Sequence, residues 1–220
     1  MDKYQKQLRA LLSPAQRRVL KKLSTPKKIQ DFLDSFPINF SRIGDTIQSP
    51  ASVLHNKKAH CIEGAVLAAA ALAYHGYPPL LMDFQTTPDD EDHVVAIFKV
   101  GKYWGALSKT NHPVLRWRDP VYKSVRELAM SYFHEYYLWN KKDGNNLGKK
   151  TLRAYSRPFN LRRYPPKKWW AVKDLDWLAE ELDSSPHSPT IPQGMEKFVR
   201  KASAIEIKAM QLQEWRKPKK

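Results

Sequence analysis

Two residues, Cys61 and His93, have the types and positions expected of a nucleophile and its general base. Cys61 is the single cysteine of the chain, and it opens an alanine-rich apolar segment, residues 61–75. At the first turn of a helix, unpaired N–H groups and the positive end of the helix dipole stabilise a thiolate, which is the nucleophilic form of cysteine. The same N–H groups can hold an oxyanion. The position therefore predicts acyl-transfer chemistry, against the alternative of a small buried thiol.

His93 begins a segment that is typical of a β-strand, HVVAIFKV. A thiol nucleophile needs an imidazole within hydrogen-bond reach, and that imidazole needs a third group to fix its tautomer and orientation. The turn at Gly101 predicts a hairpin, which places residues 108–111 opposite His93. The polar candidates for the third group are Ser108, Thr110 and Asn111.

The elements that position these residues are predicted from periodicity and from turn residues. Helices are predicted over residues 3–12, 14–23, 25–36, 51–55, 61–75, 124–139, 170–182 and 195–215. Strands are predicted over residues 80–84, 93–100, 103–109 and within 151–161. Loops are predicted through Gly44 and Asp45, around Pro113 and Pro120, and over residues 184–193. This order indicates an α+β fold with a central Cys61 helix on a small antiparallel sheet, and not alternating βαβ units.

Three consecutive pieces of this sequence resemble the transglutaminase-like superfamily, in particular its small bacterial members. The pieces are KKAHCIEGAVLAAAALAYHGYPPLLMDF, DHVVAIFKV and KYWGALSKTNHP, flanked by TPKKIQDFLDSF and RDPVYKSVRELAMSYFHEYY. The resemblance covers about residues 25–140. It implies a papain-like fold with a Cys nucleophile, a His base and an Asp that orients the His.

The resemblance assigns the nucleophile to Cys61 and the base to His93, but it departs at the third position. The Trp-x-x-x-Asp pattern of the superfamily falls on Trp104 to Ser108, so that a serine stands where the acid is expected. Asn111 is the second candidate, because a neutral amide orients the imidazole in papain-like enzymes. The site is therefore predicted to contain Cys61, His93 and either Ser108 or Asn111.

These observations favour a cysteine-dependent hydrolase or transamidase that acts on an amide or ester of a peptide or protein. Two alternatives stay open. The missing acid favours a catalytically degenerate scaffold that only binds its ligand. The basic segments favour a nucleic-acid-binding protein, and Trp169 and Trp170 beside two lysines would then stack on bases, although core packing is the simpler interpretation.

The net charge of +16 is concentrated in two segments. Residues 1–30 hold nine Lys and Arg against Asp2 alone, and residues 149–168 hold eight and no acid. The simplest interpretation of such patches is solubility and weak nonspecific binding, with nucleic acid as the sharper one. We expect a single domain over residues 1–220, with a core at about 25–140, a basic helical N-terminal extension at 1–24 and a basic helical C-terminal extension at 141–220.

Composition excludes several classes of protein. With one cysteine, neither an intrachain disulfide nor a cysteine-based metal site is expected. The acidic run from Asp89 to Asp92 lacks the spacing of a calcium loop and is interpreted as a solvated turn, so we expect no metal and no cofactor. The charged N-terminus resembles no signal peptide and no apolar run suits a membrane span, which predicts a cytoplasmic protein without membrane contact. The oligomeric state is not predicted.

Overall fold

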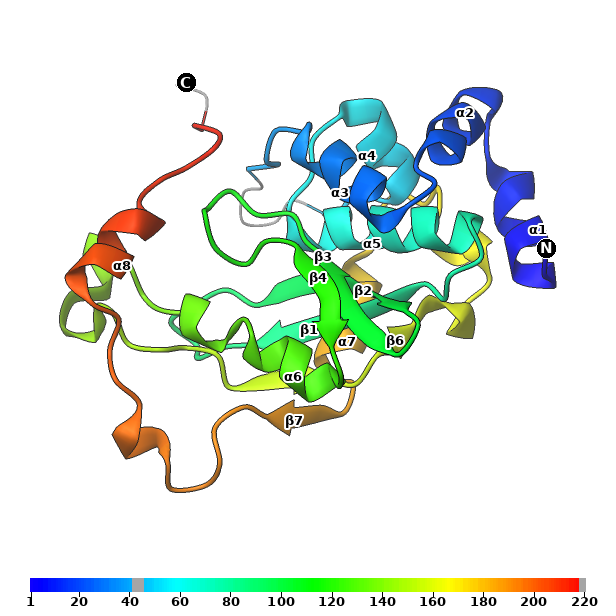
Figure 1. Ribbon diagram of the computed structural model, residues 1–220. Helices are drawn as coiled ribbons and strands as arrows, with labels where there is room; N and C mark the ends of the chain where they lie inside the picture. Colours follow the sequence, from blue (N-terminus) through cyan, green and yellow to red (C-terminus); the bar gives the residue numbers. More distant parts are fainter. Residues whose placement is uncertain (41–45, 218–220) are drawn as a thin grey trace.

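The computed structural model describes residues 1–40 and 46–217, so the predicted loop through Gly44 and Asp45 lies outside the described residues. The fold is α+β, as predicted. A mainly antiparallel sheet has helices on both faces, and the Cys61 helix packs directly on one of them (Figure 1). Among the described residues, no helix has the length and apolar character needed to cross a membrane.

Four short helices begin the chain and confirm the predicted N-terminal elements: α1 (Lys3–Leu11), α2 (Pro14–Lys22), α3 (Pro26–Asp34) and α4 (Pro50–Asn56). Asp2, Ser13 and Thr25 cap the first three, because each side chain accepts a hydrogen bond from a backbone N–H of the first turn. Proline at the first helical position of α2 and α3 supplies a suitable φ and loses no intrahelical bond.

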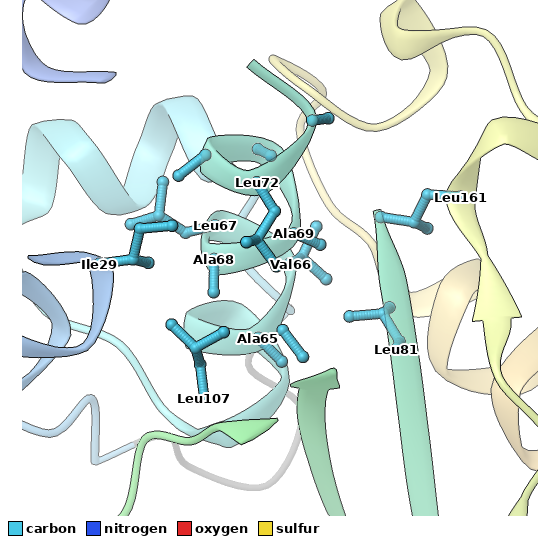
Figure 2. Packing of buried hydrophobic residues seen from close by; sticks show 14 of the residues in the cluster. Ile29, Ala65, Val66, Leu67, Ala68, Ala69, Leu72, Leu81, Leu107 and Leu161 are labelled. Atoms are coloured by element: carbon cyan, nitrogen blue, oxygen red, sulfur yellow. The ribbon is translucent and has the colours of Figure 1, made fainter. Parts of the chain in front are cut away.

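The central helix, α5 (Cys61–Tyr74), is buried on every side from Ile62 to Tyr74. Its alanines allow other elements to approach closely, and Figure 2 shows it between the α3 side chain Ile29 and the sheet residue Leu81. Gly64 marks the tightest approach, because a Cβ at this position would lie 2.6 Å from the Cβ of Lys109. The predicted helix over residues 61–75 is confirmed, and small residues are what make its central position possible.

The described strands form a sheet with the order β4-β3-β2-β1-β5-β7, with β6 also paired to β1. Their bounds are β1 (Leu80–Gln85), β2 (His93–Val100), β3 (Tyr103–Leu107), β4 (Arg118–Tyr122), β5 (Ala154–Ser156), β6 (Phe159–Asn160) and β7 (His187–Pro189). The predicted hairpin at Gly101 is present: β2 and β3 are antiparallel, and the turn glycine has a φ of +58°.

Alternation along the strands divides the core between the two faces of the sheet. Val94, Ala96 and Leu107 face α5, whereas Met82 and Val95 face the opposite layer with α6 and the tyrosines that follow it. The register pairs His93 with Phe84 and Ala96 with Leu107. His93 and Ser108 therefore belong to the face opposite α5, at the end of the sheet where Cys61 begins its helix.

The predicted helix over residues 124–139 is wrong in its second half. Helix α6 covers Val125–Met130, and a 3-10 turn comes next at Phe133–Glu135. The guanidinium of Arg118 donates to both the carbonyl and the hydroxyl of Ser131, at 3.1 and 3.0 Å. The N–H of Tyr132 bonds to the carbonyl of Ala129 and that of Glu135 to the carbonyl of Tyr132, so the chain tightens to three-residue turns where the α-helix ends.

The predictions also differ from the structure around the C-terminal half. The predicted loop around Pro120 contains strand β4, and a proline is tolerated there because β4 is the edge strand. Helices α7 (Asp176–Asp183) and α8 (Ala204–Met210) are shorter than the predicted 170–182 and 195–215. Trp169 and Trp170 are both fully buried, which confirms the core-packing interpretation of this pair.

Candidate active site

A buried carboxylate fixes the start of the Cys61 helix. Glu63, fully buried, accepts hydrogen bonds at 2.9 Å from the backbone N–H of His60 and at 2.9 Å from that of Gln48. The amide of Asn39 donates to both of its oxygens. This first-turn acid therefore ties α5 to the loop before α4, and it sets the position of the first helical residue, Cys61.

Cys61 is partly exposed as a residue, but its thiol is desolvated. Burial raises the pKa of the thiol to about 11, and the backbone N–H groups of Val94 and Ile62 oppose that rise. Desolvation outweighs the helix N-terminus in this balance, so the expected thiolate at the helix start stays a prediction, which the titration of Cys61 tests. The contribution of Val94 also locates the sulfur, since this amide directly follows His93 in strand β2.

His93 is buried and is bonded to Ser108 at a distance of 2.8 Å between Nε2 and Oγ. The Ser108 hydroxyl has one proton, and it donates that proton to the carbonyl of Leu115. The hydroxyl must therefore accept from His93, which assigns the ring proton to Nε2 and leaves Nδ1 as the basic nitrogen. Of the predicted third residues, Ser108 is the one hydrogen-bonded to His93.

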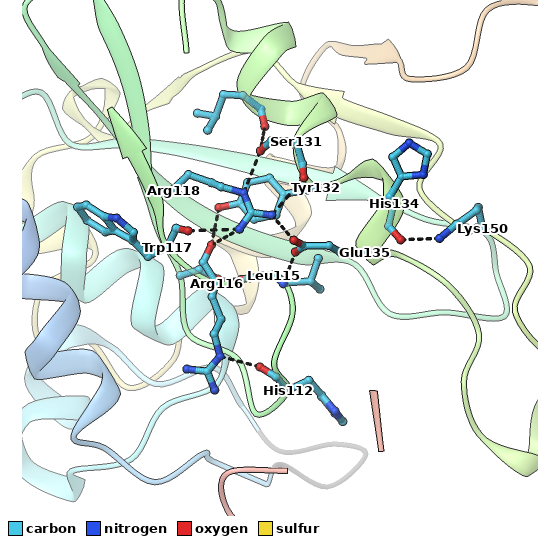
Figure 3. Close-up of polar contacts among 12 residues, drawn as sticks. His112, Leu115, Arg116, Trp117, Arg118, Ser131, Tyr132, His134, Glu135 and Lys150 are labelled. Atoms are coloured by element: carbon cyan, nitrogen blue, oxygen red, sulfur yellow. Dashed lines mark hydrogen bonds and ion pairs between the residues drawn. The ribbon is translucent and has the colours of Figure 1, made fainter. Parts of the chain in front are cut away.

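The Leu115 carbonyl is held in place by a charged network, drawn in Figure 3. Leu115 has a φ of +58°, unusual for a residue with a branched side chain. Its N–H donates to Oε2 of Glu135 at 2.6 Å, and the other oxygen of Glu135 pairs with Arg118 at 2.5 Å. Position 108 has no carboxylate, but Glu135 is linked to it: Glu135 accepts from the Leu115 N–H, and the Leu115 carbonyl accepts from the Ser108 hydroxyl.

The pKa of His93 is lowered to about 4, first by burial and then by the nearby His60. A carboxylate partner would oppose both effects, whereas the neutral Ser108 hydroxyl stabilises an imidazolium only weakly. With the thiol pKa at about 11, the Cys61 thiol and the His93 imidazole are therefore both neutral near pH 7.

The other predicted residues make contacts elsewhere. Both ends of the Asn111 amide bond to the backbone of Trp215, at 3.0 and 2.8 Å. The hydroxyl of Thr110 accepts from the N–H of His112 at 3.2 Å. Asn111 therefore fastens the C-terminal segment to the loop after β3, a contact across 104 positions of sequence that no local pattern predicts.

A pocket of about 380 Å³ opens beside Cys61, and its polar groups are mainly acidic. Its lining residues are Cys61, Ile62, Asp83, Asp92, Val94, Ala179, Glu180, Leu182 and Asp183. Burial raises the pKa of Asp83, and a hydrogen bond to His187 at 3.1 Å opposes the rise. Within the described part of the chain, carboxylate oxygens of Asp83, Asp92 and Asp183 lie within 4.8 Å of one another.

Two of these three carboxylates have a protein donor: Asp92 accepts from the N–H of Thr86 at 2.7 Å, and Asp183 accepts from the Gln85 amide at 2.8 Å. Nε2 of His187 lies 3.1 Å from Oδ2 of Asp83, while its Nδ1 faces the carbonyl of Ser185. The oxygens are of the type that hard cations prefer. The three acids therefore give the mouth of the pocket a negative potential.

Sequence patterns did not single out two residues near the site, Glu135 and Tyr136. Tyr136 is 2% exposed, and its hydroxyl has no hydrogen-bond partner among the described residues. Burial raises its pKa well above the ordinary value, and the neighbouring Cys61 raises it further. A buried unpartnered hydroxyl is costly, and one beside a nucleophile is available to a bound substrate. The helix predicted over residues 124–139 included both residues, but its periodicity did not connect either of them with Cys61.

The same region of the chain resembles known proteins. Residues 17–123 match the model of a protein family described as a transglutaminase-like domain. The chain carries a transglutaminase-like domain. The resemblance identified from the Cys61 helix and the His93 hairpin is thereby confirmed, and the matched region includes Cys61, His93 and Ser108 but not Glu135. Comparison with curated proteins gives no match.

Three solved structures of LapG from Legionella pneumophila are distantly similar to this transglutaminase-like chain. One is 17% identical, covers 48% of this chain and 70% of LapG, and has a TM-score of 0.34. A calcium-bound LapG is 18% identical over 48% and 69%, with a TM-score of 0.34. An EGTA-treated LapG is 13% identical over 82% and 96%, with a TM-score of 0.39.

Proposed function

We propose that this transglutaminase-like domain is a cysteine-dependent acyl-transfer enzyme, with Cys61 as nucleophile, His93 as general base and Ser108 as the residue that orients His93. The observation that carries the proposal is the tautomer of His93. Its Nε2–H is committed to Ser108, so Nδ1 is the basic nitrogen that would accept a proton, and the N–H of the next residue, Val94, acts on the Cys61 sulfur.

The proposed reaction starts from a neutral pair. As the Cys61 sulfur attacks the carbonyl carbon of an amide or ester, its proton passes to Nδ1 of His93. The tetrahedral oxyanion is held by N–H groups at the start of α5, and the buried hydroxyl of Tyr136 is a further candidate donor. When the intermediate collapses, the bond to the leaving group breaks and the imidazolium returns the proton to it, which leaves a thioester on Cys61.

The second half of the reaction reverses these roles. Water or an amine gives its proton to His93 and attacks the thioester carbonyl. The carbon–sulfur bond then breaks, the acyl group leaves on its new acceptor, and His93 returns the proton to the sulfur, which restores the thiol and the neutral imidazole. Hydrolysis and transamidation differ only in this acceptor. The acidic residues around the pocket disfavour anionic substrates, so we propose a neutral or cationic segment of a peptide or protein as the acyl donor.

A second candidate is the non-catalytic binding domain. It is favoured by one observation, namely that the thiol and imidazole pKa values of about 11 and about 4 leave the base weak and the nucleophile protonated. In that case the pocket beside Cys61 would bind a ligand without forming a covalent intermediate.

Trapping of the acyl-enzyme tests the proposal and separates the two candidates. The protein is mixed with p-nitrophenyl acetate at pH 8 and its intact mass is measured, and a single added acetyl group that is absent in Cys61→Ala is expected. His93→Gln should slow acylation by about 100-fold or more, the usual range for loss of a general base. His75→Gln is the matched control, because His75 caps the opposite end of α5 and bonds to Leu20. Equal acylation of wild type and His93→Gln contradicts the proposal.

A further inference from the structure

The two basic segments of the sequence are neighbours in the fold. Helix α1 packs against residues Pro166–Lys168, although about 150 residues separate them (Figure 1). The hydroxyl of Tyr4 donates to the carbonyl of Leu161 at 3.0 Å, and Arg162 reaches Asp2 at 2.7 Å. Helix α2 is fastened to α1, since Arg17 donates to the carbonyl of Arg9 at 3.0 Å. Folding therefore combines two basic segments into one surface.

This surface, the basic face, consists of exposed cationic side chains from three segments. They are Lys3 and Lys6 of α1, Arg17, Arg18, Lys21 and Lys22 of α2, and Arg162, Arg163 and Lys167. Asp2 is the single acid of the two basic segments, and Arg162 already pairs with it. On one side the face ends at Tyr164, whose hydroxyl bonds to Glu181 of α7. An exposed surface with this excess of positive charge favours a polyanionic partner.

The side chains around these cations decide which polyanion fits. Leu8 of α1 and Leu20 of α2 are fully buried in the core, which leaves Met1 and Leu11 as the large apolar side chains exposed beside the cations of these helices. Trp169 and Trp170 are also fully buried and cannot stack on unpaired bases. The described part of the face thus offers many cations, two separate exposed apolar side chains and no exposed tryptophan, which suits the regularly spaced phosphates of a duplex.

We propose that the basic face binds the phosphate backbone of double-stranded nucleic acid without preference for base sequence. Duplex DNA carries one negative charge per about 1.7 Å of axis, and each phosphate that is neutralised releases counterions. A nine-residue helix such as α1 is about 13.5 Å long, and residues 166–168 pack against it. A single duplex segment can therefore contact cations of α1 and of the 161–168 segment together. The proposal is independent of the acyl-transfer chemistry.

Fluorescence anisotropy with a labelled 25-base-pair DNA of random sequence tests it, at 50 to 200 mM NaCl. We expect log K to fall linearly with log salt, and a second duplex of different sequence to bind equally. The variant Lys6→Gln, Arg18→Gln, Lys167→Gln removes one cation from each segment. It should reduce the salt slope by about 2.7, because each lost phosphate contact accounts for about 0.9.

The control removes the same charge elsewhere, as Lys197→Gln, Arg200→Gln, Lys208→Gln. These three exposed residues lie in the C-terminal segment, on the side of the molecule away from α1 (Figure 1). An unchanged salt slope in this control supports the basic face. Equal losses in both variants would mean that net charge alone binds DNA, and no binding at 50 mM salt would overturn the proposal outright. Stronger binding to phosphatidylserine vesicles than to DNA would reassign the face to membranes.

Discussion

The pH dependence of Cys61 alkylation is the sharpest test of how the site works. Burial raises the thiol pKa from 9.0 to about 11, and the His93 pKa of about 4 leaves no imidazolium near pH 7 to stabilise a thiolate. At pH 8 the thiolate fraction is then ~0.1%, against ~10% for a thiol with the ordinary pKa, so about a 100-fold difference. Alkylation should rise about tenfold per pH unit from pH 7 to 10 with no plateau.

The assay is loss of free thiol during reaction with iodoacetamide, with intact mass measured afterwards. Since Cys61 is the only cysteine, all thiol alkylation reports on this residue. The urea-unfolded chain is the internal reference: its alkylation rate should have its midpoint near pH 9 and bend towards a plateau by pH 10, whereas that of the folded chain should keep rising. The comparison uses the shape of each pH profile, which does not depend on how easily the reagent reaches the sulfur.

One result would refute the reasoning. A plateau of alkylation between pH 4 and 8, lost in His93→Gln, would demonstrate a thiolate–imidazolium pair in the free protein. The rise in the thiol pKa caused by desolvation would then be smaller than the lowering caused by the helix N-terminus and His93 together. The Cys61 proton would pass to His93 before substrate binds. A neutral pair instead predicts the same profile for wild type and His93→Gln.

Three further predictions concern Ser108, His93 and Gly64. Ser108→Ala leaves the buried Nε2–H of His93 without its acceptor, so acylation of Cys61 should slow by about tenfold or more. Ser108→Thr keeps the hydroxyl and should retain activity. Equal acylation rates in wild type and both variants would remove Ser108 from the site. Because the folded-state pKa of His93 is lowered from 6.5 to about 4, its contribution to stability is present above pH 6.5 and is lost as the pH falls towards 4, by up to ~3 kcal/mol. Urea unfolding at pH 7 and pH 4.5 should thus show a smaller acid-induced loss in His93→Gln than in wild type, and identical losses would contradict a buried neutral imidazole. Gly64→Ala forces a Cβ to 2.6 Å from the Cβ of Lys109 and should lower the free energy of unfolding by about 1–3 kcal/mol. If the variant melts at the wild-type temperature, α5 and the segment around Lys109 separate without cost and the prediction is wrong.

Local patterns in the sequence were sufficient for the central elements. The alanine-rich run, its Gly76 end and the Gly101 turn predicted α5, β2 and β3 with bounds close to those observed, because helix and strand periodicity depend on neighbouring residues. The order of these elements also identified Cys61 and His93 as candidates. Ser108 was one of two candidates for the third position, since a shift of one or two residues in the register could not be distinguished.

Contacts between distant segments decided what periodicity could not. Arg118 bonds to Ser131 at the end of α6, and Glu135 is linked to Ser108 through Leu115, so both contacts join residues that no short motif connects. The thiol pKa has the same origin: the sequence contains the helix N-terminus that lowers it, but the desolvation that raises it comes from the whole packed surrounding of Cys61. The sequence therefore determined which groups are present for chemistry, and the tertiary structure decided their protonation and their partners, because burial and long-range hydrogen bonds exist only in the folded chain.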